Sequence, residues 1–186
     1  MARRAHALPA KRPLALSAVY RLLEPGPVVL LTTAYRGRPN VMTQSWHTMM
    51  EFEPPLVGCV VSEANHSFEA LTRTRECVIS IPTVELAQAV VGCGNTSGRM
   101  LDKFAAFGLT AQPATRVAAP RIAECRADLE CRLIDARLQS RYNFFVLQVL
   151  AGWYRPPREP LRTLHHRGRG EFMIAGPTRR LPSRAK

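Results

Sequence analysis

The feature that most constrains this chain is a pair of long segments in which apolar and polar residues alternate. The segments are residues 124–138, ECRADLECRLIDARL, and residues 141–155, RYNFFVLQVLAGWYR. In the first segment the apolar positions Ala127, Leu129, Cys131 and Leu133 alternate with Asp128, Glu130 and Arg132. A period of two predicts β-strands with one face buried and the other face exposed. Strands of this length favour a barrel or a strongly bent sheet.

The rest of the chain predicts further strands with helices inserted between them. We expect strands at residues 28–35, 41–50, 56–62 and 76–82, and helices at residues 15–23, 66–74, 83–91 and 99–108. Three strands follow one another before the first inserted helix, whereas a doubly wound sheet alternates strand and helix. The expected fold is therefore mainly β with inserted helices, an antiparallel barrel in a single domain.

Length and hydropathy limit the class of protein. The chain has 186 residues, which suits one domain with a substantial core, and 46% of them are hydrophobic. No apolar run reaches the ~18 residues that a membrane span needs, so we expect no membrane segment. The N-terminal sequence MARRAHALPAKRPLAL lacks the continuous apolar region of a secretory signal. We expect residues 1–14 to be a basic tail that frays.

The formal net charge of +12 is concentrated at the two ends of the chain. Basic residues gather in ARRAHALPAKR near the start and in RPPREPLRTLHHRGRG and RRLPSRAK near the finish. A basic chain raises the question of nucleic acid, but no basic strand here is interleaved with aromatic residues as a stacking sheet requires. We expect no nucleic-acid partner, with a colourless nucleic-acid-binding barrel as the weakest alternative. Phosphorylated small molecules are equally compatible with this charge.

The cysteines indicate buried thiols and no chemistry of their own. They are Cys59, Cys77, Cys93, Cys125 and Cys131. No two of them have the C-x-x-C spacing of a zinc or redox site. We expect free, buried thiols, no metal site and a cytoplasmic location, because a reducing compartment keeps thiols unpaired.

The strand expected at residues 41–50 is polar at its centre, where a core strand would carry valine and isoleucine. Thr43, Gln44 and Ser45 supply hydrogen-bond donors and acceptors, and Trp46 with the neighbouring methionines supplies apolar surface. A mostly apolar pocket with a few placed polar groups has this composition. We infer that this strand faces a ligand.

Two segments rich in small polar residues add candidate anion-binding groups. Asn65, His66 and Ser67 open an expected helix, and residues 92–98, GCGNTSG, precede another. The free N–H groups at a helix start attract anions. The alternatives are ordinary capping by Asn65 and an ordinary connection between two helices. The glycine-rich loop is not a dinucleotide fingerprint, because a helix precedes it where that fingerprint needs a parallel strand.

Several motifs together resemble the flavin reductase-like family, in its flavoredoxin branch of FMN-binding split β-barrels. The motifs are N-x-M-T/A-x-S/A-W at Asn40–Trp46, S-G-R-x-x-D-K-F at Ser97–Phe104 and L-E-C-x-L at Leu129–Leu133. They occur in family order, and the second is the most specific. The resemblance extends over residues 20–183 and includes the C-terminal sequence HHRGRGEFMIAGPTRRLPS.

The resemblance implies a fold, a cofactor and an activity. An FMN-binding split β-barrel would occupy residues 15–155, and residues 156–186 would form an extension packing on the barrel or on a dimer partner. The chain would form a homodimer with FMN in a cleft near the interface. It would be a flavin-dependent oxidoreductase, an NAD(P)H:FMN reductase in which NADH or NADPH gives a hydride to FMN. A partner oxygenase or another electron acceptor would take the electrons onward.

The resemblance also assigns the binding residues. They are Met42, Thr43, Gln44, Ser45 and Trp46 along the ring and ribityl chain, Ser62, Asn65, His66 and Ser67 around the phosphate, and Ser97, Gly98, Arg99 and Lys103 closing the site. Lys103 would be a counter-charge for the phosphate, and Asp102 would orient Lys103 or Arg99. Thr43 and Ser45 would stabilise the reduced flavin. No side chain is assigned a catalytic role, because the flavin carries the chemistry.

Several positions depart from the family pattern, and relatives often have threonine and tyrosine where this chain has Ser67 and Phe68. Ser62 and Glu63 stand where many relatives have an arginine or lysine near the phosphate, and Asn143 stands near a position where many have a histidine beside the flavin. Asparagine cannot act as an acid at neutral pH. A non-catalytic or slow FMN-binding or carrier protein of the same fold is therefore the alternative function.

The histidines outside these motifs predict no metal site. His47 is out of phase with Trp46 along the strand, so we expect it on the opposite face as a surface or interface residue. His165 and His166 are adjacent and cannot both face one site from a strand, so we expect a solvated pair.

Overall fold

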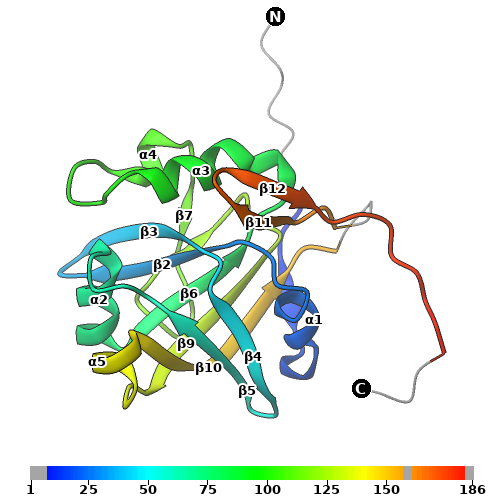
Figure 1. Ribbon diagram of the computed structural model, residues 1–186, viewed down its shortest axis with the longest axis horizontal. Coiled ribbons are helices and arrows are strands. Elements are labelled where there is room, and N and C mark those ends of the chain that lie inside the picture. The colour runs from blue at the N-terminus through cyan, green and yellow to red at the C-terminus, as the bar shows by residue number, and fades with distance from the viewer. Residues whose placement is uncertain (1–7, 157–160, 183–186) are drawn as a thin grey trace, which may run out of the picture.

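The protein is built around one strongly curved antiparallel sheet. A computed structural model describes residues 8–156 and 161–182, and Figure 1 shows the sheet wrapping round on itself with helices at its rim. The strands of this sheet are β1 (Arg12–Leu14), β2 (Val29–Tyr35), β3 (Arg38–Gln44), β4 (His47–Phe52), β5 (Pro55–Val60), β6 (Glu76–Ile81), β9 (Ala127–Asp135) and β10 (Phe144–Tyr154). Their order in space is β3-β2-β6-β9-β10-β5-β4, and β1 pairs with β10.

Short helices and two small hairpins complete the fold. The helices are η1 (Leu16–Ala18), α1 (Tyr20–Leu23), α2 (His66–Thr74), η2 (Val84–Leu86), α3 (Ala87–Asn95), α4 (Lys103–Ala106) and α5 (Gln139–Tyr142). The hairpins pair β7 (Ala111–Gln112) with β8 (Arg121–Ile122) and β11 (Leu164–Gly168) with β12 (Glu171–Ile174). Among the described residues, no helix is both long and apolar enough to cross a membrane.

The two long strands form where alternation predicted them. β9 and β10 pair antiparallel along most of their length, and the register shifts twice, which bends the sheet. Leu129, Leu133 and Leu147 from these strands lie at the centre of the barrel core. The prediction of an exposed polar face is wrong for two residues: Asp128 and Glu130 are both 0% exposed. Their carboxylates are covered by the N-terminal segment and by the loop around β7 and β8, which lie on the outside of β9.

The strand predicted at residues 41–50 is two strands. β3 ends at Gln44 and β4 begins at His47, so Ser45 and Trp46 connect the two edges of the sheet. Val60 of β5 holds both sides of this break. Its carbonyl accepts a hydrogen bond from the Gln44 Nε2 at 2.8 Å, and its N–H donates to the Trp46 carbonyl at 3.0 Å. We call Ser45–Trp46 the seam of the barrel. The local pattern gave no sign of the break, because both halves have strand-like sequences.

The helices differ from their predicted lengths, and local contacts explain the difference. α3 runs on to Asn95, so residues expected in the loop 92–98 are helical. Gly92 lets the Phe107 ring pack directly on this helix, because a Cβ there would lie 2.3 Å from the ring. The helix expected at 99–108 shrinks to α4, since Asp102 caps it and Gly108, with φ of 63°, ends the turn that follows.

The described segments near both termini are attached to the barrel, the N-terminal one further than expected. Residues 12–14, expected in a fraying basic tail, pair with β10 through β1, and Lys11 forms an ion pair with buried Asp128. At the other end, the Leu164 carbonyl accepts a hydrogen bond from the Val28 N–H at 2.6 Å. The β11–β12 hairpin therefore lies against the barrel beside α3, as Figure 1 shows, whereas the segment after it runs away from the barrel.

Candidate functional site

The polar strand β3 presents two different faces. Asn40, Met42 and Gln44 are buried on the side of the barrel interior, where Met42 joins the main core. Val41 lies on the other side, in a second core that contains residues of α3 and α4. Because side chains alternate along a strand, Thr43 shares the face of Val41. The side chains predicted to bind FMN therefore divide between two faces, and Met42 and Gln44 have protein partners.

The outer face of β3 is joined to α3. The Thr43 hydroxyl donates to the Val90 carbonyl at 2.5 Å. A Cβ added to Gly94 would lie 3.4 Å from the Thr43 Cβ, so the end of the helix passes close to the strand. Ser45, the next residue on this face, has no hydrogen-bond partner among the described residues.

A cavity of about 280 Å³ opens beside this strand, between β3, α3 and the C-terminal hairpin. Thr43 and Ser45 line it from the strand, Asn95 from the end of α3, and His166 and Phe172 from the hairpin. Two larger hollows exist, of about 500 Å³ between α1 and β4 and about 630 Å³ beside residues 134–137. Of the described residues that line these two, none was predicted to bind FMN. The smaller cavity is therefore the candidate site.

The predicted phosphate-binding residues gather further along β3, at the start of α2. The Asn40 Nδ2 donates to the Ser67 hydroxyl at 2.8 Å, which ties the strand to the helix. Gly98 packs onto the same place, because a Cβ there would lie 2.0 Å from the Asn40 Oδ1 and 2.9 Å from the His66 ring. Only glycine allows this approach. The chain from Gly94 to Gly98 thus follows β3 from Thr43 back to Asn40.

The two other predicted residues near this helix start have modest roles within the protein. Asn65 occupies the N-cap position of α2, but its side chain makes no capping hydrogen bond. The Ser62 hydroxyl accepts from the Ala64 N–H at 3.3 Å, and Glu63 is exposed to solvent. The alternative role of Asn65 as a capping side chain, which its position in the sequence suggested, is therefore not seen.

The segment from Ser97 to Lys103 is held mainly by its own backbone. Ser97 accepts a hydrogen bond from the Arg99 N–H at 3.3 Å, and the Arg99 side chain is exposed. The prediction that Asp102 orients Lys103 or Arg99 is wrong. Its Oδ1 accepts from the N–H groups of Phe104 and Ala105, at 2.9 and 3.3 Å, and so caps α4.

Lys103 points into the protein. The residue is only 5% exposed, and its Nζ donates to the Cys93 carbonyl of α3 at 2.7 Å. Burial lowers the pKa of this ammonium, and the nearby Cys93 partly offsets that effect. The position gives Lys103 a structural partner, and its role toward a phosphate stays a prediction.

Trp46 and His47, which follow one another at the seam and the start of β4, differ in exposure. The Trp46 side chain is 71% exposed, whereas His47 is half-buried with its Nε2 2.7 Å from the Pro27 carbonyl. The carbonyl can only accept, so Nε2 carries the proton, and Nδ1 is buried without a partner among the described residues. Burial lowers the pKa of His47, and the bond to Pro27 opposes that shift.

The C-terminal hairpin is the part of the site that sequence reasoning missed. His165 is not the solvated residue we expected, because its Nδ1 lies 3.1 Å from the Gly26 carbonyl and its Nε2 lies 2.9 Å from the Thr163 hydroxyl. His166 faces the cavity and packs against Phe172, with ring centroids 5.2 Å apart. The sequence signal was present in two short runs around glycines, LHHRG and EFMI, which are typical of a hairpin.

The cysteines and Asn143 complete the comparison with the sequence. All five cysteines are free and buried, as predicted. Burial raises the pKa of Cys93, which lies beside the site, to about 11. Asn143 was expected within the strand 141–155, but it ends α5 in the left-handed region with φ of 54°. Its carbonyl accepts from the Val61 N–H at 3.0 Å, which places it next to Ser62.

Comparison with known proteins points to one family. A model described as the flavin reductase like domain matches residues 21–171. The uncharacterized protein YddH of Escherichia coli K12 is 32% identical over 178 residues, which are 88% of this chain and 94% of that protein. An uncharacterized protein of Pyrococcus abyssi is 31% identical over 136 residues, 73% of this chain and 78% of its own length.

Solved structures share the fold. An FMN-binding domain of a flavin reductases-like enzyme from Shewanella baltica superposes with a TM-score of 0.88 and 26% identity, covering 95% of this chain and 100% of that one. The flavoredoxin of Desulfovibrio vulgaris has a TM-score of 0.78 and 22% identity, covering 100% of this chain and 99% of that one. At this identity the flavoredoxin supports the barrel architecture alone.

Proposed function

This chain belongs to the flavin reductase-like family, and from that premise we propose that it binds FMN and catalyses its reduction by NADH or NADPH. The observation that carries the proposal is the cavity between β3, α3 and the C-terminal hairpin. It contains Thr43 and Ser45, the residues for which the sequence offered no structural role. The Shewanella baltica protein that shares 26% identity with this chain is described as FMN-binding, which supports the same cofactor here.

The residues present at the cavity fit part of a flavin ring. Its volume of about 280 Å³ is close to the lower end of the roughly 300–1,000 Å³ found for ligand sites. Val28, Val90 and Phe172 give it apolar walls. The free hydroxyl of Ser45 supplies a donor that no described residue uses. An apolar slot with one or two unsatisfied polar groups suits a flat heterocycle whose edge carries carbonyl and ring nitrogens.

The phosphate would lie at the other end of the same strand. Asn40 and Thr43 are three residues apart, which in a β-strand is roughly 10 Å. At that end the start of α2 contributes N–H groups, and His66, Ser67 and Gly98 lie together. Thr43 and Ser45 would thus contact the ring, the loop from Gly94 to Gly98 would follow the ribityl chain, and the helix start would receive the phosphate.

The protein's own part in such a reaction is orientation. When bound, FMN would supply the two-electron chemistry by accepting a hydride equivalent from the nicotinamide ring. Ser45 and the backbone amides of the seam would hold the ring edge where negative charge develops on reduction. Val90, Val91 and Phe172 would keep water from that edge. These roles require no nucleophile or acid–base pair.

We further propose that the chain forms a homodimer through the surface around the site. Trp46, itself a predicted binding residue, is 71% exposed, and Met100, which follows the predicted binding residue Arg99, is 81% exposed. Large apolar side chains that remain exposed beside a cavity are typical of interface cores. A second subunit placed there would cover the mouth of the cavity. Light scattering of the purified protein measures the mass directly, and a monomer would contradict this arrangement.

The electron acceptor is proposed at the level of class. The structure of nitrilotriacetate monooxygenase component B from Mycobacterium thermoresistibile shares this fold with a TM-score of 0.68 and 22% identity. Its name describes one component of an oxygenase system. A partner oxygenase is accordingly the acceptor we propose to test first, with direct transfer to another bound acceptor as the second.

The experiment is a visible spectrum of the purified protein with FMN under nitrogen, followed by NADH and then NADPH in separate samples. We expect the bound flavin to bleach with at least one nucleotide. If FMN binds but stays oxidised with both nucleotides, the alternative function, an FMN carrier, would replace the proposed reductase. A protein that does not bind FMN would overturn the proposal. The variant Ser45→Ala should weaken FMN binding, whereas Ser140→Ala, on exposed α5, should leave it unchanged.

A further inference from the structure

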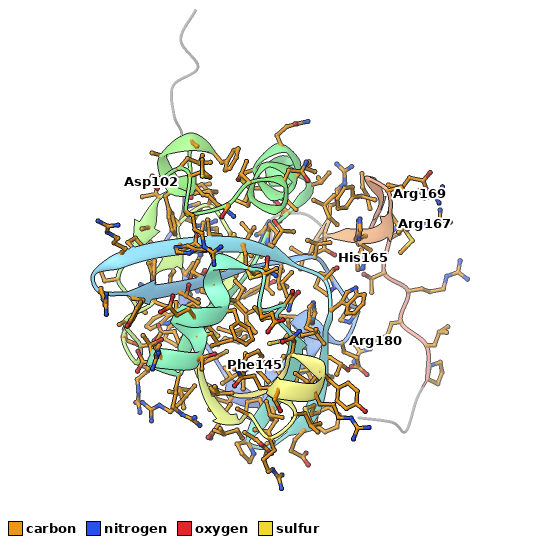
Figure 2. All side chains as sticks on the ribbon, turned by 60° about the vertical axis from the view of Figure 1, so that its left-hand side comes forward. Asp102, Phe145, His165, Arg167, Arg169 and Arg180 are labelled. Carbon is orange, nitrogen blue, oxygen red and sulfur yellow. The ribbon has the colours of Figure 1, made fainter. Side chains whose placement is uncertain are left out.

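The C-terminal hairpin forms one wall of the candidate cavity and ends in a cationic turn. His166 and Gly170 line the cavity, and the residues between them are Arg167, Gly168 and Arg169. Both arginines are exposed. Figure 2 shows them together at the outer end of the hairpin, away from the barrel. The tight turn itself is Arg169–Gly170, with φ of 50° and 79°, and it follows Gly168, the last residue of β11, with φ of 94°. We call residues 167–169 the hairpin arginine turn.

No carboxylate in the part of the chain that the structure describes forms an ion pair with this turn. The ion pairs found in residues 8–156 and 161–182 are Lys11–Asp128 and Arg137–Asp135, and neither involves the hairpin. Glu171 follows in the same hairpin, opposite Gly168, and is exposed. It is one negative charge beside two positive ones, so the turn keeps a net positive charge at the rim of the cavity.

The cavity is too small for a whole nicotinamide nucleotide. About 280 Å³ admits one ring system, which the proposed function gives to the flavin, so the ribose, phosphate and adenine parts of a dinucleotide stacked on that flavin must lie beyond the rim. On the α3 side the rim residues Val91, Gly94 and Asn95 are uncharged. On the hairpin side the rim leads directly to the arginines. Phosphates outside the cavity therefore meet cations at the hairpin.

We propose that Arg167 and Arg169 bind the adenosine 2′-phosphate of the reductant and make this protein prefer NADPH over NADH. The inference rests on the proposed function, because it deepens the same site. A phosphomonoester carries between one and two negative charges at neutral pH, more than each diester phosphate of the dinucleotide bridge. The planar guanidinium group donates to phosphate oxygens in pairs, which makes arginine suited to this recognition. NADH has no phosphate at that position.

The chain contains a matched control for this turn. Residues 36–38 also read Arg-Gly-Arg, and Arg36 and Gly37 form the turn between β2 and β3, with φ of 52° and 73°. That turn lies at the end of β3 opposite to Ser45. The double variant Arg36→Ala/Arg38→Ala removes two positive charges at a turn of the same kind without touching the cavity. Because Arg38 is two residues from Asn40, at the proposed phosphate end, all three proteins are compared at saturating FMN.

The experiment compares the two nucleotides in three proteins: the wild type, Arg167→Ala/Arg169→Ala and the control pair. We expect the wild type to use NADPH with a kcat/KM at least tenfold above that for NADH. The hairpin variant should lose at least tenfold for NADPH and less than threefold for NADH. The control variant should match the wild type. Equal losses for both nucleotides would assign the arginines to the shared diphosphate bridge and overturn the proposal.

A binding measurement separates this inference from the proposed function. Calorimetric titration of the FMN-loaded protein with adenosine 2′,5′-bisphosphate, against adenosine 5′-monophosphate, needs no turnover. We expect tighter binding of the bisphosphate, lost in the hairpin variant and kept in the control. If neither nucleotide reduces bound FMN, the proposed reductase function is overturned, and the titration still decides whether the phosphate site exists. Equal affinity for the two adenosine ligands would overturn the phosphate site alone.

Discussion

Polar residues occur inside two strands of the same sheet, and they behave in opposite ways. On β9 the carboxylates of Asp128 and Glu130 are fully buried, and each is surrounded by donors. At the end of β3 the Ser45 hydroxyl is half-buried beside a cavity, with no partner among the described residues. A polar residue in a strand therefore does not itself indicate a binding site. A polar group whose hydrogen bonds the protein leaves unsatisfied does.

The β9 carboxylates show how complete that saturation is. Asp128 pairs with Lys11 and accepts from the Ser80 hydroxyl at 2.7 Å and from the Ile122 N–H at 3.2 Å. Glu130 accepts from the backbone N–H groups of Thr115 and Arg116, from the Thr115 hydroxyl and from the Trp153 indole N–H at 2.7 Å. These groups have no capacity left for a ligand. They fasten the N-terminus and the loop around β7 to the outside of the barrel.

The largest effect on stability should follow from removing the saturated Asp128 carboxylate of β9. Asp128→Ala leaves the ammonium of Lys11 buried without its partner, in a place where desolvation already lowers its pKa. We expect a loss of about 3–5 kcal/mol in the free energy of unfolding, measured by urea denaturation. Asp135→Ala, in the exposed pair with Arg137, should leave the midpoint unchanged. Similar midpoints for both variants would show that the Lys11–Asp128 pair does not hold the N-terminal segment on the barrel.

If Asp128→Ala does not fold, the double change Lys11→Met/Asp128→Leu tests the same point. Replacing both partners by apolar residues leaves no unpaired charge. This variant should recover part of the stability, because the Ser80 hydroxyl and the Ile122 N–H still lose their acceptor.

A smaller effect should follow at Lys103, which belongs to the predicted site but has a structural partner. Lys103→Met removes the hydrogen bond to the Cys93 carbonyl and the positive charge together. We expect a loss of about 1–3 kcal/mol of stability and equal weakening of FMN and riboflavin, measured by fluorescence titration. Much greater weakening of FMN than of riboflavin would instead establish Lys103 as the counter-charge of the phosphate.

The smallest effect concerns pH and His47. Burial lowers the folded-state pKa of this imidazole below its ordinary value of about 6.5, so the unfolded chain binds the proton more readily. The resulting stability is present above that value and is lost as the pH falls through the depressed folded pKa. His47→Gln should therefore reduce the loss of stability between about pH 7 and pH 5, by at most about 1 kcal/mol. An unchanged pH profile would show that other groups dominate.

The sequence predicted those features of the fold that depend on local patterns. β9 and β10 followed from alternation, and the burial of the cysteines followed from the apolar runs around them. The motif at Ser97–Phe104 led to the correct family. These features required no knowledge of which distant segments meet.

The remainder depends on contacts between residues far apart in the chain. Lys11 and Asp128 are 117 positions apart, so the burial of Asp128 could not be read from its own strand. Likewise, the hairpin wall forms because Leu164 meets Val28, and neither segment signals the other. The capping role of Asp102 was missed for a different reason, since the motif suggested a ligand where a helix start sufficed.

The seam at Ser45–Trp46 has a consequence for how the barrel is assembled. Strands β3 and β4 stand at opposite ends of the sheet order, yet only these two residues separate them in the chain. The entropy lost in closing a loop grows with its length, so bringing these two edges together costs little. The candidate site is thus located at a junction with a low entropic cost of closure, and an inserted residue there would displace the pairing registers of both edges at once.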